Sequence, residues 1–109
     1  MKLEHHPFEI IDWSSIPKEE HSGISGIAIW QTIMMGEIRI RMVEYSVGYV
    51  ADHWCSKGHI IFCIDGEMET ELKDGRKFIF QKGMTYQVGD NSDAHRSSSA
   101  KGCKLFIVD

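Results

Sequence analysis

Two Asp-Gly dipeptides in the middle of the chain constrain its fold more than any other feature. Asp65-Gly66 and Asp74-Gly75 stand at either end of segment 68–72, and each is flanked on its other side by a further short apolar segment. Asp-Gly is favoured in two-residue turns that need a positive φ, so both positions predict β-hairpins. Within segment 68–72, apolar and polar residues alternate as they do in a half-buried strand. The middle of the chain therefore predicts antiparallel strands.

The same pattern of strands continues through the rest of the chain after residue 23. Further strands are expected over 24–34, 38–47, 60–64, 77–81, 84–88 and 103–108. In 38–47 the apolar residues move from even to odd positions after Met42, which predicts a β-bulge. Many short strands separated by turns at regular spacing are typical of an antiparallel sandwich or barrel. The expected fold class is all-β, with no helix and no internal repeat.

Size and charge exclude several classes of function. A chain of 109 residues has the size of one domain. The net charge is -4 and no basic run occurs, so the chain has no general attraction to nucleic acid or to an anionic membrane. No apolar stretch reaches the roughly 20 residues that span a bilayer, and the polar first residues do not resemble a secretory signal. We therefore expect a cytoplasmic protein whose partner is a small-molecule ligand, with no nucleic acid and no membrane partner.

Residues 1–23 differ from the rest and predict an N-terminal arm, which leaves 24–109 as the folded domain. Pro7 and Pro17 interrupt regular structure within this arm. The arm also carries apolar side chains, among them Phe8, Ile11 and Trp13, and we expect it to pack on the domain. These side chains offer more apolar surface than one small domain covers, so a homodimer is expected.

Metal-ligating side chains gather in one segment and at one distant residue. His53 and Cys55 lie two residues apart on an expected strand, where alternate side chains point to the same face. His59 begins the next strand after a short turn at 56–58, and His95 follows a polar loop far along the chain. The predicted site is a metal ion held at the mouth of a barrel by these four side chains, His53, Cys55, His59 and His95.

Imidazole and thiolate ligands suit zinc, iron(II), nickel or copper and do not suit magnesium or calcium. The expected cofactor is therefore a divalent transition metal. The alternative is a pocket whose polar side chains hold only water. Cys63 and Cys103 are expected in the core, since buried cysteine behaves as a small apolar residue. His5, His6 and His21 lie in the polar arm and are expected to face solvent.

The predicted ligand segment resembles the first motif of the cupins. In that motif a Gly is followed by His-x-His, then by a Glu, then by a second Gly. This chain has Gly48, His53-Trp54-Cys55, His59 and Gly66. The Asp-His-x-Cys segment followed by Lys-Gly-His is similar to a small group of short bacterial cupins known by a DHCW-type motif. The resemblance covers 24–108 and implies a cupin antiparallel β-barrel, or jelly roll.

The second cupin motif is matched in part. Gly83 and His95 fit it, whereas Asp90, Ser92 and Ser99 stand where cupins have Pro, Gly and Asn. In the first motif, a cysteine replaces the usual second histidine and a histidine replaces the usual glutamate. Either set combines three neutral ligands with one anion, so the charge left on a divalent ion is the same. The softer thiolate favours zinc, iron(II), nickel or copper over manganese.

Three functions agree with these residues. The first is a metal-dependent enzyme that acts on a small molecule; its catalytic residues are unassigned, since Glu37 and Glu44 are candidates for a base by residue type alone. The second is a non-catalytic module that binds or senses a small ligand, a metal or the redox state, with Cys55 as the redox-sensitive group. The third is a purely structural metal site, because four protein ligands are typical of closed structural zinc.

Overall fold

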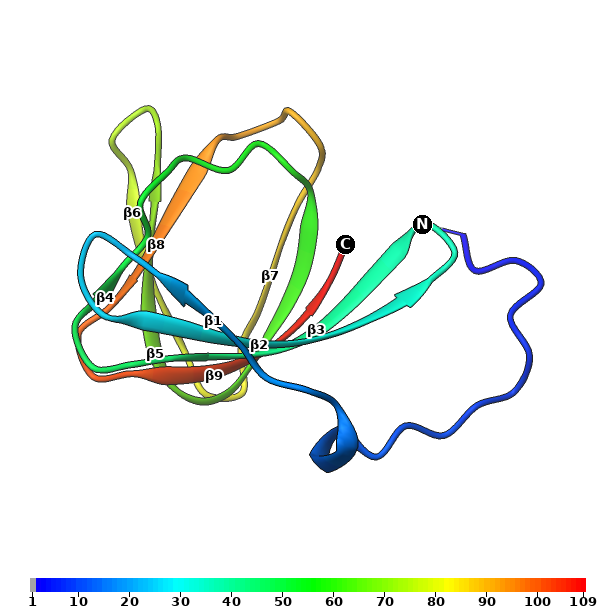
Figure 1. The fold of residues 1–109 in the computed structure, drawn as a ribbon. Coiled ribbons are helices and arrows are strands. Elements are labelled where there is room, and N and C mark those ends of the chain that lie inside the picture. The colour runs from blue at the N-terminus through cyan, green and yellow to red at the C-terminus, as the bar shows by residue number, and fades with distance from the viewer. Residues whose placement is uncertain (1) are drawn as a thin grey trace.

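The structure of the protein is a computed structural model that describes residues 2–109. Within this range it is all-β apart from one short 3-10 helix, which confirms the expected fold class. The elements in chain order are η1 (Trp13–Ser15), β1 (Glu19–Ser22), β2 (Ile27–Met35), β3 (Ile38–Tyr45), β4 (Tyr49–Val50), β5 (His59–Leu72), β6 (Lys77–Gln81), β7 (Thr85–Val88), β8 (His95–Ser99) and β9 (Cys103–Val108). Figure 1 shows the strands curling into a partly closed barrel.

The strands form one antiparallel sheet in the order β1-β2-β3-β9-β5-β8-β4, and β6 and β7 also pair with β5. Strand β5 is the longest, with 14 residues. Its first half pairs with β7 and β9, and its second half pairs with β6 and β8. Strand β5 therefore passes from one wall of the barrel to the other, as Figure 1 shows.

The core lies between these walls. Its buried members are Val43, Ile61, Cys63, Met68, Phe80, Cys103, Leu105 and Ile107. Burying one large apolar side chain stabilises a fold by about 1.5–3 kcal/mol, so this cluster holds the two walls together. Cys63 and Cys103 are 0% and 5% exposed, which confirms that both are core residues.

The hairpin expected at Asp65-Gly66 is wrong, because β5 runs without a turn from His59 to Leu72. The dipeptide instead lies within β5 directly after a β-bulge against β9, where the register shifts between Cys63 and Asp65. Gly66 has a φ of 78°, a conformation that glycine adopts at little cost. Before the bulge the inward side chains of β5 have odd numbers, as Cys63 does, and after it they have even numbers, as Met68 does, and both residues are buried.

Two other expectations for the strands have different outcomes. The hairpin at Asp74-Gly75 is confirmed, since β5 and β6 pair directly across it. The bulge expected in 38–47 is absent, because β3 keeps a single register with β2 and with β9. Inward positions of β3 hold Arg41 and Val43, which are 5% and 3% exposed. A buried arginine in place of an apolar residue therefore produced the apparent change of parity.

Replacing Gly66 with alanine is expected to destabilise the protein by about 3 kcal/mol, because the added methyl group would overlap the carbonyl oxygen of Gly102 and strain the backbone. Gly36→Ala is the matched control. Its φ is 62° and no atom of residues 2–109 lies within 4 Å of the added carbon, so only backbone strain of about 1 kcal/mol is expected. Urea unfolding measures both losses, and equal losses would contradict the role of the close approach.

The N-terminal arm contacts the sheet near η1, and the residues before η1 loop outward and return to the turn between β2 and β3 (Figure 1). Gln31 Nε2 on β2 donates hydrogen bonds to the carbonyl oxygens of Trp13 and Ile16, at 2.6 and 2.9 Å. Phe8 and Ile10, farther along the arm, are 92% and 83% exposed. Among residues 2–109, no helix has the length and apolar character that crossing a membrane requires.

Candidate metal centre

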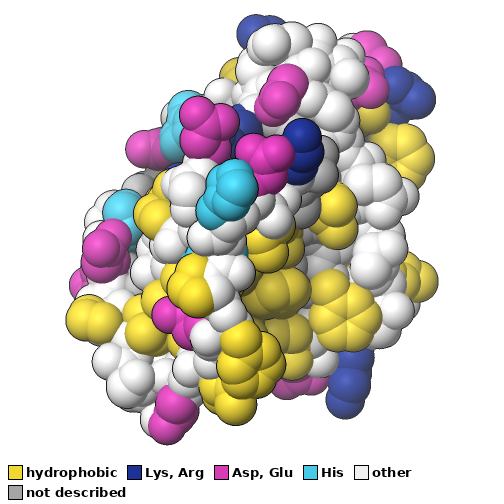
Figure 2. Space-filling model, turned by 90° about the vertical axis from the view of Figure 1, so that its right-hand side faces the viewer, with side chains coloured by type: hydrophobic (Ala, Val, Ile, Leu, Met, Phe, Trp, Pro, Cys, Tyr) yellow, Lys and Arg dark blue, Asp and Glu magenta, His cyan; other side chains and the backbone are white. Residues whose placement is uncertain are grey.

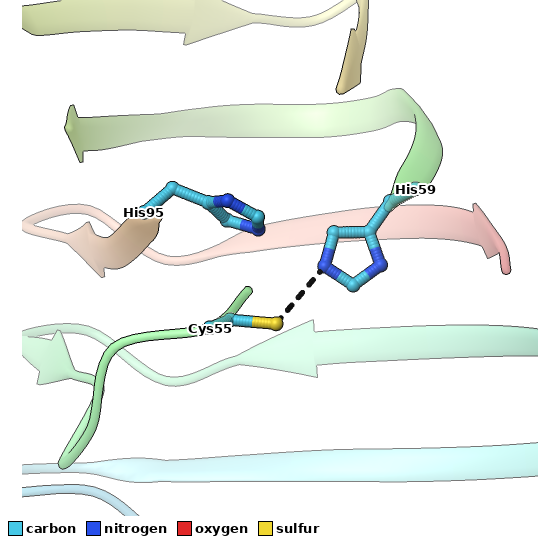
Figure 3. Close-up of side chains that lie close together, drawn as sticks. All are labelled: Cys55, His59 and His95. Carbon is cyan, nitrogen blue, oxygen red and sulfur yellow. Dashed lines mark hydrogen bonds between the residues drawn. The ribbon is translucent and has the colours of Figure 1, made fainter. Parts of the chain in front are cut away.

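Three of the four predicted ligands lie together in the structure. Their ligand atoms, the Sγ of Cys55 and one ring nitrogen each of His59 and His95, are all within 4.8 Å of one another. Cys55 comes from the loop between β4 and β5, and the two histidines are the first residues of β5 and β8. Figure 3 shows the three side chains pointing toward one another from these separate elements.

Backbone hydrogen bonds fix Cys55 beside His95. The Cys55 N–H donates to the His95 carbonyl oxygen at 2.8 Å, and the His95 N–H donates to the Cys55 carbonyl oxygen at 2.9 Å. This isolated bridge holds the loop against β8. The two residues are therefore aligned although they lie far apart in the sequence.

A carboxylate orients the ring of His59. Nδ1 of His59 lies 2.8 Å from Oδ2 of Asp109, which accepts its proton in a hydrogen bond. This tautomer leaves the lone pair of Nε2 directed toward Cys55 Sγ, 3.4 Å away (Figure 3). A carboxylate on the far nitrogen also raises the basicity of a metal-ligating histidine. His59 therefore offers Nε2 as a ligand atom.

His95 offers the same atom. Its Nδ1 lies 2.8 Å from the backbone carbonyl oxygen of Asp93, which can only accept, so Nδ1 carries the proton. Its Nε2 is buried and has no hydrogen-bond partner among the residues that the structure describes. Burial lowers the pKa of His95 and favours the neutral ring. An unpartnered buried acceptor is unfavourable, and a metal ion at this point would satisfy it.

His53 lies outside this group. Residues 51–54 form no strand, so the shared face expected for His53 and Cys55 does not arise. The imidazole of His53 is 76% exposed, and its Nδ1 lies 2.5 Å from Oδ1 of Asp52. The structure thus brings three of the predicted ligands together without His53, whose part in the site stays a prediction.

A buried carboxylate that the sequence pattern did not predict supports the group. The side chain of Asp109 is 0% exposed and accepts hydrogen bonds from Arg39 Nε and Arg41 Nη2, both at 2.9 Å. Burial alone would raise the pKa of Asp109, but the hydrogen bonds of His59 and Arg39 and the charge of Arg41 hold that pKa well below its usual range. The signal in the sequence was Arg39 and Arg41 at alternate positions, because two cations on one inward face need a buried anion.

The donor atoms fit a divalent transition metal. Two imidazole nitrogens and one sulfur are ligands that zinc, iron(II), nickel and copper prefer, whereas magnesium and calcium prefer oxygen. Three protein ligands also leave one position open, as in catalytic zinc sites. The group is therefore suited to hold an ion with a small molecule beside it.

This chain matches known proteins in structure and not in sequence. No protein-family model matches it, and a search of curated proteins finds no match either. A predicted oxalate decarboxylase from Thermotoga maritima superposes with a TM-score of 0.77 and 14% identity, over 92% of this chain and 96% of that one. A cupin-2 domain protein from Shewanella frigidimarina gives a TM-score of 0.58 and 15% identity, over 71% and 74%. A structure of HppE with Fe(II) and an alternative substrate gives a TM-score of 0.76 and 13% identity, over 94% of this chain and 60% of that one.

These structural neighbours establish the fold. The chain is a small cupin-fold protein, an antiparallel jelly-roll barrel of the kind that its first motif resembles. The Cys55, His59 and His95 group adds a possible metal-binding site to that barrel.

Proposed function

We propose that this protein is a small metal-binding cupin that binds or acts on a small molecule at a transition-metal ion. One observation carries the proposal: the unpartnered Nε2 of His95 is buried beside the Sγ of Cys55 and a ring nitrogen of His59. The structural likeness to HppE, whose structure contains Fe(II) and a substrate, supports a metal and a small ligand in the same fold.

Each of the three side chains has one task in this proposal. Cys55 supplies a thiolate, since metal coordination deprotonates a thiol. His59 and His95 supply neutral Nε2 atoms, which the Asp109 carboxylate and the Asp93 carbonyl oxygen hold in orientation. When bound, a divalent ion acts as a Lewis acid toward the oxygen atoms of a small molecule.

His53 is proposed as the fourth ligand. It lies two residues before Cys55, on a loop segment with no strand pairing. To reach the ion, its ring must give up the hydrogen bond to Asp52 and leave the surface. We therefore expect His53 to contribute less to metal affinity than Cys55, His59 and His95, whose ligand atoms already lie close to one another. With His53 bound, a small molecule reaches the ion only if the coordination expands beyond four, and a set that stays closed at four protein ligands would favour the structural role.

Elemental analysis of freshly purified protein tests the proposed function. The expected result is about one zinc, iron, nickel or copper ion per chain. Magnesium or calcium alone, or no transition metal after gentle purification, would contradict a metal-binding cupin.

Redox sensing through Cys55 is a second candidate function. The Sγ of Cys55 is 3.4 Å from Nε2 of His59, whose Nδ1 is hydrogen-bonded to Asp109. A thiol beside a histidine that a carboxylate orients is the arrangement that activates nucleophilic cysteines. Cys55 is also half-buried, whereas Cys63 and Cys103 are buried.

Alkylation by iodoacetamide distinguishes ligation from sensing. Cys55 is expected to react first, because burial raises the pKa of Cys63 and raises the pKa of Cys103 to about 11. If Cys55 is a ligand, one equivalent of zinc should slow its reaction about tenfold or more, since the bound thiolate is protected. Mass spectrometry after timed reactions measures the rates. Equal rates with and without zinc would favour sensing and argue against ligation.

We also propose that the chain acts in the cytoplasm as a homodimer, with residues 1–23 as an arm and 24–109 as the cupin domain. Apolar side chains remain on the surface of the single chain, including Phe8 at 92% exposed and Ile60 and Phe62 on β5 at 47% and 40%. Figure 2 shows hydrophobic side chains lying next to one another on one face, among charged ones. Such a surface is typical of a protein–protein contact. Three free cysteines agree with a reducing compartment.

Light scattering at micromolar concentration checks the homodimer. The expected species has twice the chain mass of 12.5 kDa. Phe62→Glu is expected to shift the protein toward the single chain, because a charge buried in an apolar interface is unfavourable. A 12.5 kDa species for the unmodified protein would contradict the homodimer.

A further inference from the structure

A cavity with mostly apolar walls includes His95 of the candidate metal centre. Its volume is about 490 Å³, within the range of about 300–1,000 Å³ that is typical of small-molecule sites. The rings of His95 and Tyr86, which both line it, have centroids 6.2 Å apart. The apolar part of the wall consists of Leu72, Phe78, Ile79, Phe80, Met84 and Val88.

Apart from the proposed metal ion, the cavity offers no cationic side chain that would pair with an anion. Its lining residues, all within the described part of the chain, include no lysine or arginine. The lining carboxylate is Asp93, which is half-exposed and lies 3.6 Å from Arg76 Nη2. Arg39 and Arg41 are already paired with Asp109. In the metal-free protein, an anionic ligand would therefore lose its hydration without gaining a cationic partner.

Two buried polar atoms of the lining residues lack a hydrogen-bond partner. Thr70 is 5% exposed and His95 is 3% exposed, and both line the cavity. Among residues 2–109, neither Oγ1 of Thr70 nor Nε2 of His95 makes a hydrogen bond of good geometry, and the hydroxyl group of Tyr86 lies beside Oγ1 of Thr70. Because an unpartnered buried hydroxyl is unfavourable, a ligand that brings one hydrogen-bonding group to Thr70 gains affinity from it.

We propose that this cavity binds a small uncharged molecule with an aromatic or similar apolar body and a single hydroxyl group, of which phenols are the simplest examples. The apolar walls contact the body, and Thr70 Oγ1 hydrogen-bonds to the hydroxyl group. The polar end of the ligand then lies beside His95 and so beside the proposed ion. This inference names the ligand class of the proposed metal site, and it rests on that proposal only for the presence of the ion.

Binding of 2-naphthol, 2-naphthoate and naphthalene to the full chain without added metal tests the ligand class. NMR shifts of the Met84 methyl group report on occupancy of the cavity. We expect 2-naphthol to bind about tenfold or more tightly than 2-naphthoate, because the carboxylate finds no partner. We expect 2-naphthol to bind about threefold to tenfold more tightly than naphthalene, because of one hydrogen bond.

Thr70→Val tests the hydroxyl contact, since valine keeps the shape of threonine and removes Oγ1. The affinity for 2-naphthol is expected to fall about threefold or more, toward that of naphthalene, while naphthalene binding stays unchanged. Thr32→Val on β2, outside the cavity, is the matched control and should leave both affinities unchanged.

Two results would overturn the inference. One is 2-naphthoate binding as tightly as 2-naphthol, and the other is a Thr70→Val variant that binds 2-naphthol as well as Thr32→Val does. A zinc titration of the same sample reports on the metal site separately. Zinc binding that fails while 2-naphthol remains preferred would contradict the metal site and support the ligand class.

Discussion

Alanine at Cys55, His59 or His95 is expected to lower the affinity for zinc about 100-fold or more. Each residue supplies one ligand atom to a group whose atoms lie within 4.8 Å of one another. Structural zinc sites bind with about 10–16 kcal/mol in total, so losing one ligand of three removes at least about 3 kcal/mol. That loss corresponds to about 100-fold or more in affinity. Competition with a chromophoric chelator measures it.

Two other histidine variants set the scale for this result. His53→Ala is expected to lower zinc affinity only about tenfold, because three ligands stay in place. His5→Ala, in the arm, should leave zinc affinity unchanged, and circular dichroism should confirm that each variant is folded. Wild-type affinity in Cys55→Ala, or an equal loss in His53→Ala and His95→Ala, would show that the three-residue group is not the centre of the site.

Asp109→Asn is expected to lower both the free energy of unfolding and the affinity for zinc. Asparagine keeps the shape of the side chain but removes the charge that faces Arg39 and Arg41. Removing one partner of a buried ion pair costs about 3–5 kcal/mol. Losing the carboxylate that orients a metal-ligating histidine typically lowers metal affinity about 10–100-fold. Urea unfolding and chelator competition measure the two effects.

Asp52→Asn is the matched control for this variant, because Asp52 also contacts a histidine but is 58% exposed. Its effect on stability should be small compared with that of Asp109→Asn, as for most surface substitutions. Similar losses in Asp52→Asn and Asp109→Asn would mean that burial of the carboxylate does not matter.

Acid is expected to narrow the difference in stability between the wild type and Asp109→Asn. The pKa of Asp109 lies well below its ordinary value of 3.8, since the three paired side chains outweigh the effect of burial. The ionised carboxylate therefore stabilises the fold fully above that ordinary value, and the stabilisation is lost as the pH falls below it. Unfolding at about pH 7 and about pH 2 measures the gap. A gap that does not change with pH would exclude the charge as its source.

The local pattern predicted the all-β class because turns and alternation are properties of neighbouring residues. The hairpin at Asp74-Gly75 and the core position of Cys63 could be predicted in this way. The same dipeptide at Asp65-Gly66 continues strand β5, because both residues pair with β9, and the Gly102 carbonyl oxygen leaves no room for a side chain at Gly66. That contact joins distant parts of the chain, and no local pattern contains it.

In the candidate site, too, local patterns predicted some features, whereas others depend on contacts between distant parts of the chain. Residue types alone indicated Cys55, His59 and His95, and the structure brings them together. The spacing of His53 and Cys55 implies a shared face only on a strand, whereas Cys55 is held by a single bridge to His95 and residues 51–54 are irregular. The role of Asp109 depends on the pairing of β3 with β9, which places it beside two arginines.

Absorption of the cobalt-substituted protein tests most directly whether Cys55 is a metal ligand beside His59 and His95. One equivalent of Co²⁺ is predicted to give a thiolate-to-metal band in the near ultraviolet, since coordination to the metal deprotonates the thiol. The His5→Ala protein should keep the band, and folded Cys55→Ser should lose it. An absence of the band at saturating cobalt, or a band that persists in Cys55→Ser, would contradict a metal site built on Cys55.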